Sequence, residues 1–149
     1  MKNILLLTFA FVLFTACNKD ETVDYVTKND EQIQAYIAEN NLTAKKSSSG
    51  LYYVIDTPGT GAQPTATSDV TIAYKGYFLN GTVFDQNTNG YTTNLQQVIK
   101  GWTEGIPYFK EGGSGILLVP AHLGYGNNDY YTIPGGSVLI FDVELISIN

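Results

Sequence analysis

Cys17 and His122 are the only cysteine and the only histidine among the 149 residues of the chain. One residue of each type is too few for a structural zinc site, a disulfide framework or a Cys-His nucleophile pair. All eight basic residues are lysines, and the formal net charge is −6, which disfavours binding to the phosphate backbone of a nucleic acid. Most metal and covalent chemistry is therefore excluded, and we expect no metal site, no cofactor and no nucleic-acid partner.

Aromatic, acidic and hydroxyl side chains are the remaining groups that could form a site. The chain has eleven Tyr, seven Phe and one Trp. Aromatic residues at strand or helix spacing, such as Tyr74, Trp102 and Phe141, are usually part of a core. Asp85 in isolation is typical of a solvated turn, and Tyr125, which follows a glycine, is typical of loop closure. These residues gain a functional interpretation only from the motifs in which they stand.

The N-terminus has the pattern of a secretory signal. Lys2 precedes an apolar run over residues 4–14, which is too short to span a bilayer as a helix and suits the h-region of a signal peptide. Small residues and then Cys17 follow, a pattern that resembles the lipobox of bacterial lipoproteins, with Phe14 in the place where leucine is usual. We expect residues 1–16 to be removed and Cys17 to be lipidated. The alternative is an incidental thiol after an ordinary signal.

Residues 17–50 are expected to connect this anchor to the domain. The polar stretch up to Lys28 has the composition of a tether, and residues 19–21 resemble surface-export signals of Bacteroidetes-type lipoproteins. The Ser-rich residues 45–50 predict a flexible joint.

A short amphipathic helix is predicted within this connecting segment. Asn29 followed by Gln32 has the spacing of a helix N-terminus, and apolar residues at helical spacing continue to a stop at residues 40–41. We expect the apolar stripe of this helix to dock on the domain rather than to form a dimer seam.

Residues 51–149 carry the pattern of a single β-rich domain. Apolar and polar residues alternate around Ile72 and again in the final segment, where Leu139, Phe141, Val143 and Leu145 are expected to face the core. Asn80-Gly81 is a strong hairpin signal. The expected elements are strands at residues 51–56, 70–75, 82–84, 116–119 and 139–145, a polar loop at 85–90 and a short helix at 97–105. We therefore predict the α+β class, with an antiparallel sheet and one central helix.

Five motifs follow one another along this domain. They are Tyr74-Lys75-Gly76 with NGTVFD at residues 80–85, VIKGWTEG at 98–105, Gly124-Tyr125-Gly126, Ile133-Pro134, and LIFDVEL at 139–145. In type and order these motifs resemble the FKBP-type peptidyl-prolyl cis-trans isomerase family. The resemblance implies a five- or six-stranded antiparallel half-barrel sheet wrapped around one short helix. The lipidated N-terminus resembles bacterial envelope members, some of which are associated with gliding motility.

The resemblance also implies a proline-binding pocket. It places catalytic roles on Tyr74, Phe84, Asp85, Ile99, Trp102, Tyr125 and Phe141, and substrate-binding roles on Tyr91, Gln97, Val98, Gly124 and Ile133. The proline ring would rest on Trp102. The N–H of Ile99, in the first turn of the helix, and the hydroxyl of Tyr125 would bind substrate carbonyls. The Asp85 carboxylate matches the family's acidic position beside the twisting amide.

Three departures from the family pattern concern this pocket. The family often pairs the acid with an arginine a few residues later, and this chain has no arginine. Residues 127–132 lack the family's usual histidine, and Tyr91 stands in place of a phenylalanine. We expect Asp85 to be held differently, the substrate preference to be altered, and His122 to be a surface residue outside the site.

Rotation about an X-Pro bond breaks no covalent bond, so a dry pocket that binds the twisted amide is sufficient. The sequence therefore predicts an enzyme, a peptidyl-prolyl cis-trans isomerase that assists the folding of envelope proteins. Expected partners are proline-containing polypeptide segments, macrolides such as tacrolimus or rapamycin, and a membrane that the protein reaches through its lipid anchor. The expected location is the cell envelope, at the outer membrane. The alternatives are a chaperone-like or motility-complex binding module with little turnover, and a small-ligand carrier.

Overall fold

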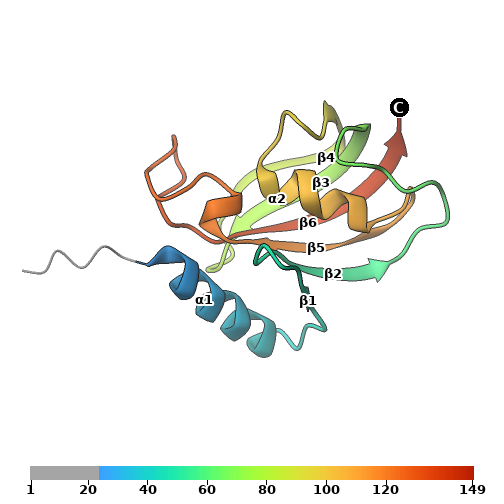
Figure 1. The fold of residues 1–149 in the computed structure, drawn as a ribbon. Coiled ribbons are helices and arrows are strands. Elements are labelled where there is room, and N and C mark those ends of the chain that lie inside the picture. Colours follow the sequence, from blue (N-terminus) through green and yellow to red (C-terminus); the bar gives the residue numbers. More distant parts are fainter. Residues whose placement is uncertain (1–23) are drawn as a thin grey trace, which may run out of the picture.

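The computed structural model describes residues 24–149, which form one six-stranded antiparallel sheet curved around a short helix (Figure 1). The strand order is β1-β2-β5-β6-β3-β4. The strands are β1 (Lys45–Lys46), β2 (Tyr52–Thr57), β3 (Asp69–Phe78), β4 (Val83–Asn94), β5 (Ser114–Val119) and β6 (Leu139–Ile148). The helices are α1 (Tyr25–Glu39), α2 (Lys100–Gly105) and two 3-10 turns, η1 (Ile106–Tyr108) and η2 (Ala121–Leu123). This architecture confirms the predicted α+β class.

Apolar side chains cover both faces of the sheet at its centre, because successive residues of a strand point to opposite faces. The core on the α2 side includes Trp102, Phe109 and the β6 residues Leu139, Phe141, Val143 and Leu145, which were predicted to face it. A second core on the α1 side is formed by Ile33, Tyr52, Leu118, Val138 and Ile140. The two helices therefore lie on opposite faces of one sheet (Figure 1).

The N-terminus of α1 lies earlier than the sequence predicted. Asp24 is the N-cap, and its Oδ1 accepts hydrogen bonds from the N–H groups of Val26 (3.1 Å) and Thr27 (3.4 Å). A carboxylate at this position satisfies N–H groups that have no intrahelical partner. The predictions of a tether up to Lys28 and of an N-cap at Asn29 were therefore wrong. Both residues lie inside the helix.

The docking of α1 on the sheet is confirmed. Ile33 is fully buried in the second core. Asn29 is also fully buried. Besides donating to Gln32 of the same helix at 3.1 Å, its amide accepts from the N–H of Ala121 at 2.8 Å and donates to the carbonyl of Gly136 at 3.0 Å. The helix ends at Asn40, the C-cap, as predicted. Residues 1–23, which include the predicted signal peptide and Cys17, lie outside the described residues.

The flexible joint predicted over residues 45–50 is ordered by backbone pairing. β1 pairs with β2, and the N–H of Ser47 donates to the carbonyl of Leu51 at 2.8 Å. The hydroxyl of Ser49 donates to Glu104 of α2 at 2.6 Å. The prediction of flexibility was wrong here because serine content alone does not reveal these long-range partners.

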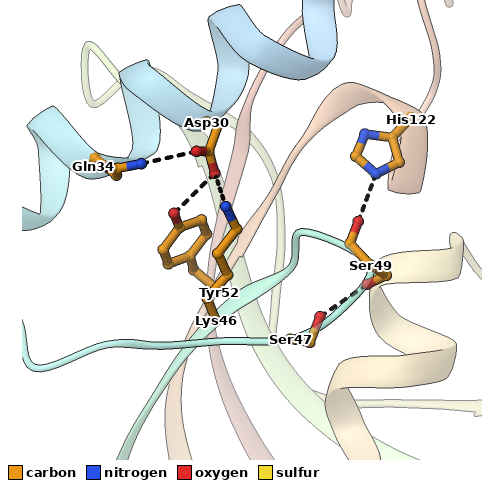
Figure 2. A network of polar contacts seen from close by, with 7 residues as sticks. All are labelled: Asp30, Gln34, Lys46, Ser47, Ser49, Tyr52 and His122. Carbon is orange, nitrogen blue, oxygen red and sulfur yellow. Dashed lines mark hydrogen bonds and ion pairs between the residues drawn. The ribbon is translucent and has the colours of Figure 1, made fainter.

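Polar contacts also tie α1 to this segment (Figure 2). The Asp30 carboxylate accepts from the Nζ of Lys46 (2.6 Å), the hydroxyl of Tyr52 (2.9 Å) and the amide of Gln34 (2.8 Å). The hydrogen bond from Lys46 lowers the pKa of Asp30 below its ordinary value. His122 is exposed, as predicted, and its Nε2 lies 2.8 Å from the carbonyl oxygen of Ser49.

The polar loop predicted over residues 85–90 is instead part of β4. This strand pairs with β3 along its length, with Gly76 opposite Asp85 and Ile72 opposite Tyr91. β4 is an edge strand of the sheet, and seven of its twelve residues are exposed, so it lacks the apolar alternation that marks a strand in sequence. The register shifts near Gly90, whose φ is +107°, which is the signature of a β-bulge.

Two glycines bring α2 close to β5. A Cβ atom on Gly101 would lie 2.5 Å from Cγ1 of Val119, and one on Gly105 would lie 2.8 Å from Cδ2 of Leu117. Both distances are shorter than van der Waals contact between carbon atoms. The predicted short helix is present, but it begins at Lys100 and not at residue 97, and its glycines allow it to pack directly on the strand and to bury Trp102.

We predict that Gly101→Ala destabilises the protein, although alanine normally favours a helix by about 1 kcal/mol over glycine. The added methyl group has to displace Val119, and overpacking of this kind costs about 1–3 kcal/mol. Urea unfolding measures the change. Lys100→Ala, an exposed substitution in the same helix, is the control and should shift the free energy of unfolding by less than about 0.5 kcal/mol. A Gly101→Ala variant more stable than wild type would contradict this packing.

Candidate functional site

A cavity of about 390 Å³ opens beside α2, between the sheet and the loop after η2. Its lining residues are Tyr74, Phe84, Asp85, Tyr91, Gln97, Val98, Ile99, Trp102, Tyr125, Tyr130 and Phe141. Ten of these were expected from the sequence. The volume lies within the range of about 300–1,000 Å³ that is usual for small-ligand sites.

The floor of the cavity is a cluster of edge-to-face aromatic rings. The centroid of the Trp102 ring lies 4.9 Å from that of Tyr74 and 5.4 Å from that of Phe141, with interplanar angles of 84° and 78°. Phe84 meets Phe141 at 5.6 Å and 89°. Rings favour such edge contacts because the positive edge of one faces the negative face of the other. The cluster therefore gives the floor a fixed, apolar shape.

Gly76 makes room for this cluster. It lies opposite both Asp85 and Phe141 in the sheet. A Cβ atom there would approach the Phe84 and Phe141 rings to 2.7 and 2.9 Å. Glycine at this position of β3 thus allows both rings to pack across the strand.

The indole N–H of Trp102 is buried, and it has no hydrogen-bond partner among the described residues. An unpaired buried donor costs about 1–3 kcal/mol of stability. The chain carries this cost at the cavity floor, and unpaired buried polar groups of this kind call for a functional explanation.

Asp85 receives a hydrogen bond from a tyrosine. The hydroxyl of Tyr74 donates to its Oδ2 at 2.7 Å. Burial, and then this hydrogen bond to the carboxylate, raise the pKa of Tyr74 above its ordinary value. The phenol therefore remains protonated and continues to donate. In a chain without arginine, Tyr74 is the group that orients the acid at the rim.

Two hydrogen-bond donors come from different segments that line the cavity, Ile99 and Tyr125. Ile99 is the N-cap of α2 rather than a residue of its first turn, and within residues 24–149 no group accepts a hydrogen bond from its N–H. The Tyr125 ring is stacked on Tyr130, with centroids 4.6 Å apart and an interplanar angle of 13°. Burial, followed by the neighbouring Tyr130, raises the pKa of Tyr125. Its hydroxyl therefore remains a donor at neutral pH.

The loop after η2 differs from the sequence-based expectation at three positions. Tyr130 lines the cavity but was not predicted to do so. Gly124 and Ile133 were predicted site residues, yet neither belongs to the lining. The Ile133 side chain is buried in the core, and its backbone pairs with that of Tyr130. Aromatic enrichment in an otherwise polar loop was the sequence signal that could have identified Tyr130.

In residues 24–149, no group of three or more His, Cys, Asp or Glu side chains is arranged to hold a metal ion. No helix in the same range is long and apolar enough to cross a bilayer.

Comparison with known proteins identifies close structural and sequence relatives. The chain is 46% identical to the isomerase FkpA of Buchnera aphidicola subsp. Schizaphis graminum over 70% of its length and 43% of that protein. It is 41% identical to a probable FkpA of Neisseria meningitidis serogroup B over 81% of its length and 47% of that protein. The chain thus spans less than half the length of these curated relatives.

Solved structures give the same picture. The crystal structure of FkpA from Escherichia coli matches 83% of this chain and 61% of its own, with a TM-score of 0.75 and 32% identity. The crystal structure of AtFKBP13 matches 71% of this chain and 98% of its own, with a TM-score of 0.66 and 32% identity. The family model described as FKBP-type peptidyl-prolyl cis-trans isomerase matches residues 61–146. With this match, the fold and the aromatic cavity, the chain belongs to the FKBP-type peptidyl-prolyl cis-trans isomerase family.

Proposed function

We propose that the protein is a peptidyl-prolyl cis-trans isomerase that assists the folding of envelope proteins by rotating their X-Pro bonds. The observation that carries this proposal is the aromatic cavity floored by Trp102 in a member of this family. The cavity, of about 390 Å³, has room for a proline ring and the amide before it, and its floor is apolar.

Such a site does not have to make or break a covalent bond, but it has to lower a large rotational barrier. Rotation about a peptide bond has a barrier of about 18–20 kcal/mol. Each tenfold acceleration requires about 1.4 kcal/mol of binding to the twisted amide in excess of binding to the planar one. A water-poor aromatic site supports this by lacking the hydrogen bonds that stabilise the planar, resonance-polarised amide in water.

Each group around the cavity has a role in this proposal. The proline ring rests on Trp102. The N–H of Ile99 and the hydroxyl of Tyr125 donate to substrate carbonyls on either side of the ring. The carboxylate of Asp85, oriented by Tyr74, lies beside the twisting amide. Support for these roles comes from the position of the residues around one cavity.

The location and partners follow from the sequence of the N-terminus. A signal peptide over residues 1–16 and lipidation of Cys17 would place the protein in the cell envelope, anchored to the outer membrane. Its substrates would be proline-containing segments of unfolded envelope proteins. Tacrolimus or rapamycin would compete with these segments for the cavity.

The proposal predicts an uneven series of substitutions. Tyr125→Phe removes one hydroxyl donor and should lower kcat/KM about two- to tenfold. Asp85→Val and Phe84→Ala should lower it further, because the first removes the charge beside the amide and the second opens a cavity wall to water. A protease-free isomerisation assay on a panel of X-Pro peptides measures kcat/KM.

His122→Ala is the control for this series, because its imidazole contacts Ser49 outside the cavity. It should retain wild-type kcat/KM. The kcat/KM values of all variants are compared under conditions in which urea unfolding curves show that every variant is folded. A wild-type protein that binds X-Pro peptides without accelerating their isomerisation would contradict the proposal and favour a binding module on the same fold.

The raised pKa values of Tyr74 and Tyr125 predict how activity depends on pH. Both hydroxyls keep their protons beyond the ordinary tyrosine pKa of about 10, so kcat/KM should stay level between about pH 7 and pH 10. Above about pH 10 the unfolded chain loses tyrosine protons before the folded chain does, so the free energy of unfolding should fall as pH rises. An activity loss with a midpoint below about pH 9 would show that another group controls the site.

Lipidation of Cys17 predicts membrane association that depends on one sulfur atom. In a host that processes lipoproteins, the wild-type protein should incorporate labelled palmitate and sediment with membranes. Cys17→Ala should lose both the label and the membrane association. Cys17→Ser, which keeps a side chain of similar size without the sulfur atom, should lose both as well. Unlabelled, freely soluble wild-type protein would contradict the anchor.

A further inference from the structure

Asn29 of α1 bonds to both ends of one loop. Its Oδ1 accepts from the N–H of Ala121, and its Nδ2 donates to the carbonyl of Gly136. These partners lie 92 and 107 residues away in sequence. We call these two hydrogen bonds the Asn29 clasp. One side chain from outside the loop thus closes residues 121–136.

The clasped loop carries two tyrosines of the site, Tyr125 and Tyr130. Inside the loop, the N–H of Gly126 donates to the carbonyl of Ala121 at 2.8 Å, and the N–H of Gly136 donates to the carbonyl of Gly126 at 2.9 Å. The residue next to Tyr125 is therefore bonded to both residues that Asn29 holds. A shift of either loop end would be transmitted to the tyrosine through two hydrogen bonds.

The burial of Asn29 is unusual for a helix that only has to cover an apolar sheet. Asn29 is the one fully buried polar side chain among the described residues, whereas its helix neighbour in the second core is Ile33. Burying an amide is unfavourable unless its groups are paired. Here the pairing partners are loop backbone groups that would otherwise be buried without partners. α1 also lies outside residues 61–146, the segment that matches the family model.

We infer that Asn29 is a positioning residue for the isomerase site, which it controls by fixing the ends of the loop that presents Tyr125 and Tyr130. This inference rests on the proposed function. It implies that the docking of α1 on one face of the sheet and the activity of the cavity on the other are coupled. Displacing α1 would lower activity while leaving the Trp102 floor in place.

The first test is a double-mutant cycle in kcat/KM with the full chain. Asn29→Ala should lower kcat/KM about two- to tenfold, the same range as loss of the Tyr125 hydroxyl through which it acts. In a Tyr125→Phe background, Asn29→Ala should then cost less than about twofold, because coupled sites are not additive. Independent losses that multiply would overturn the inference, since a merely structural role predicts them.

Ile33→Ala is the matched control, because it truncates a fully buried side chain of the same helix that has no hydrogen bond to the loop. Measurements are made where both variants are fully folded. Ile33→Ala should keep kcat/KM within about twofold of wild type, even if it lowers the unfolding midpoint as much as Asn29→Ala. An equal activity loss in both variants would show that the effect reflects general stability and would overturn the inference.

Native-state amide exchange provides a readout that does not depend on activity. The amides of Gly126 and Gly136 should exchange at least about tenfold faster in Asn29→Ala than in Ile33→Ala. Unchanged exchange in an active protein would overturn the clasp and leave the proposed function standing. An inactive wild type would overturn the proposed function and the catalytic part of this inference, whichever way the exchange experiment turns out.

Discussion

The close approach of α2 to β5 is the constraint on which the site depends. Gly101 and Gly105 have no side chains, so the helix can lie directly on Val119 and Leu117. At this distance Trp102 becomes buried among rings from two different strands. A helix held further out would leave a gap that core side chains or water would fill, and the cavity would lose its apolar floor. The lack of side chains at Gly101 and Gly105 thus sets the position of the Trp102 floor.

The sheet uses both of its faces, and this division links stability to the site. The α2 face supplies the aromatic floor, and the α1 face supplies a second core around Ile33 (Figure 1). The polar contacts of Asp30 join α1 to the segments β1 and β2 (Figure 2), and those of Asn29 join it to both ends of the segment between β5 and β6. The loop with Tyr125 is one of these segments. Groups far from the cavity therefore contribute to the geometry of its rim.

Periodicity and motif order predicted the parts of the fold that depend on local pattern. β6 and α2 could be predicted because an element that is buried on one side has apolar residues at regular intervals in the sequence. β4 was not, because an edge strand with exposed Asn and Thr residues carries no such period. Asn29 has the residue type of an N-cap, and only the fold reveals that its partners are Ala121 and Gly136. The aromatic content of its loop pointed to Tyr130, but its stacking on Tyr125 is set by loop geometry and not by a local pattern.

The central claim is that the Trp102 cavity itself accelerates X-Pro rotation. Exchange NMR on an X-Pro peptide with a substoichiometric amount of protein tests this claim most directly. Uncatalysed exchange takes tens to hundreds of seconds at 25 °C. The account predicts cis-trans exchange on the second timescale or faster, together with a shift of the Trp102 indole N–H resonance when peptide is added. Exchange at the uncatalysed rate, in a sample in which the peptide shifts the Trp102 resonance, would contradict it.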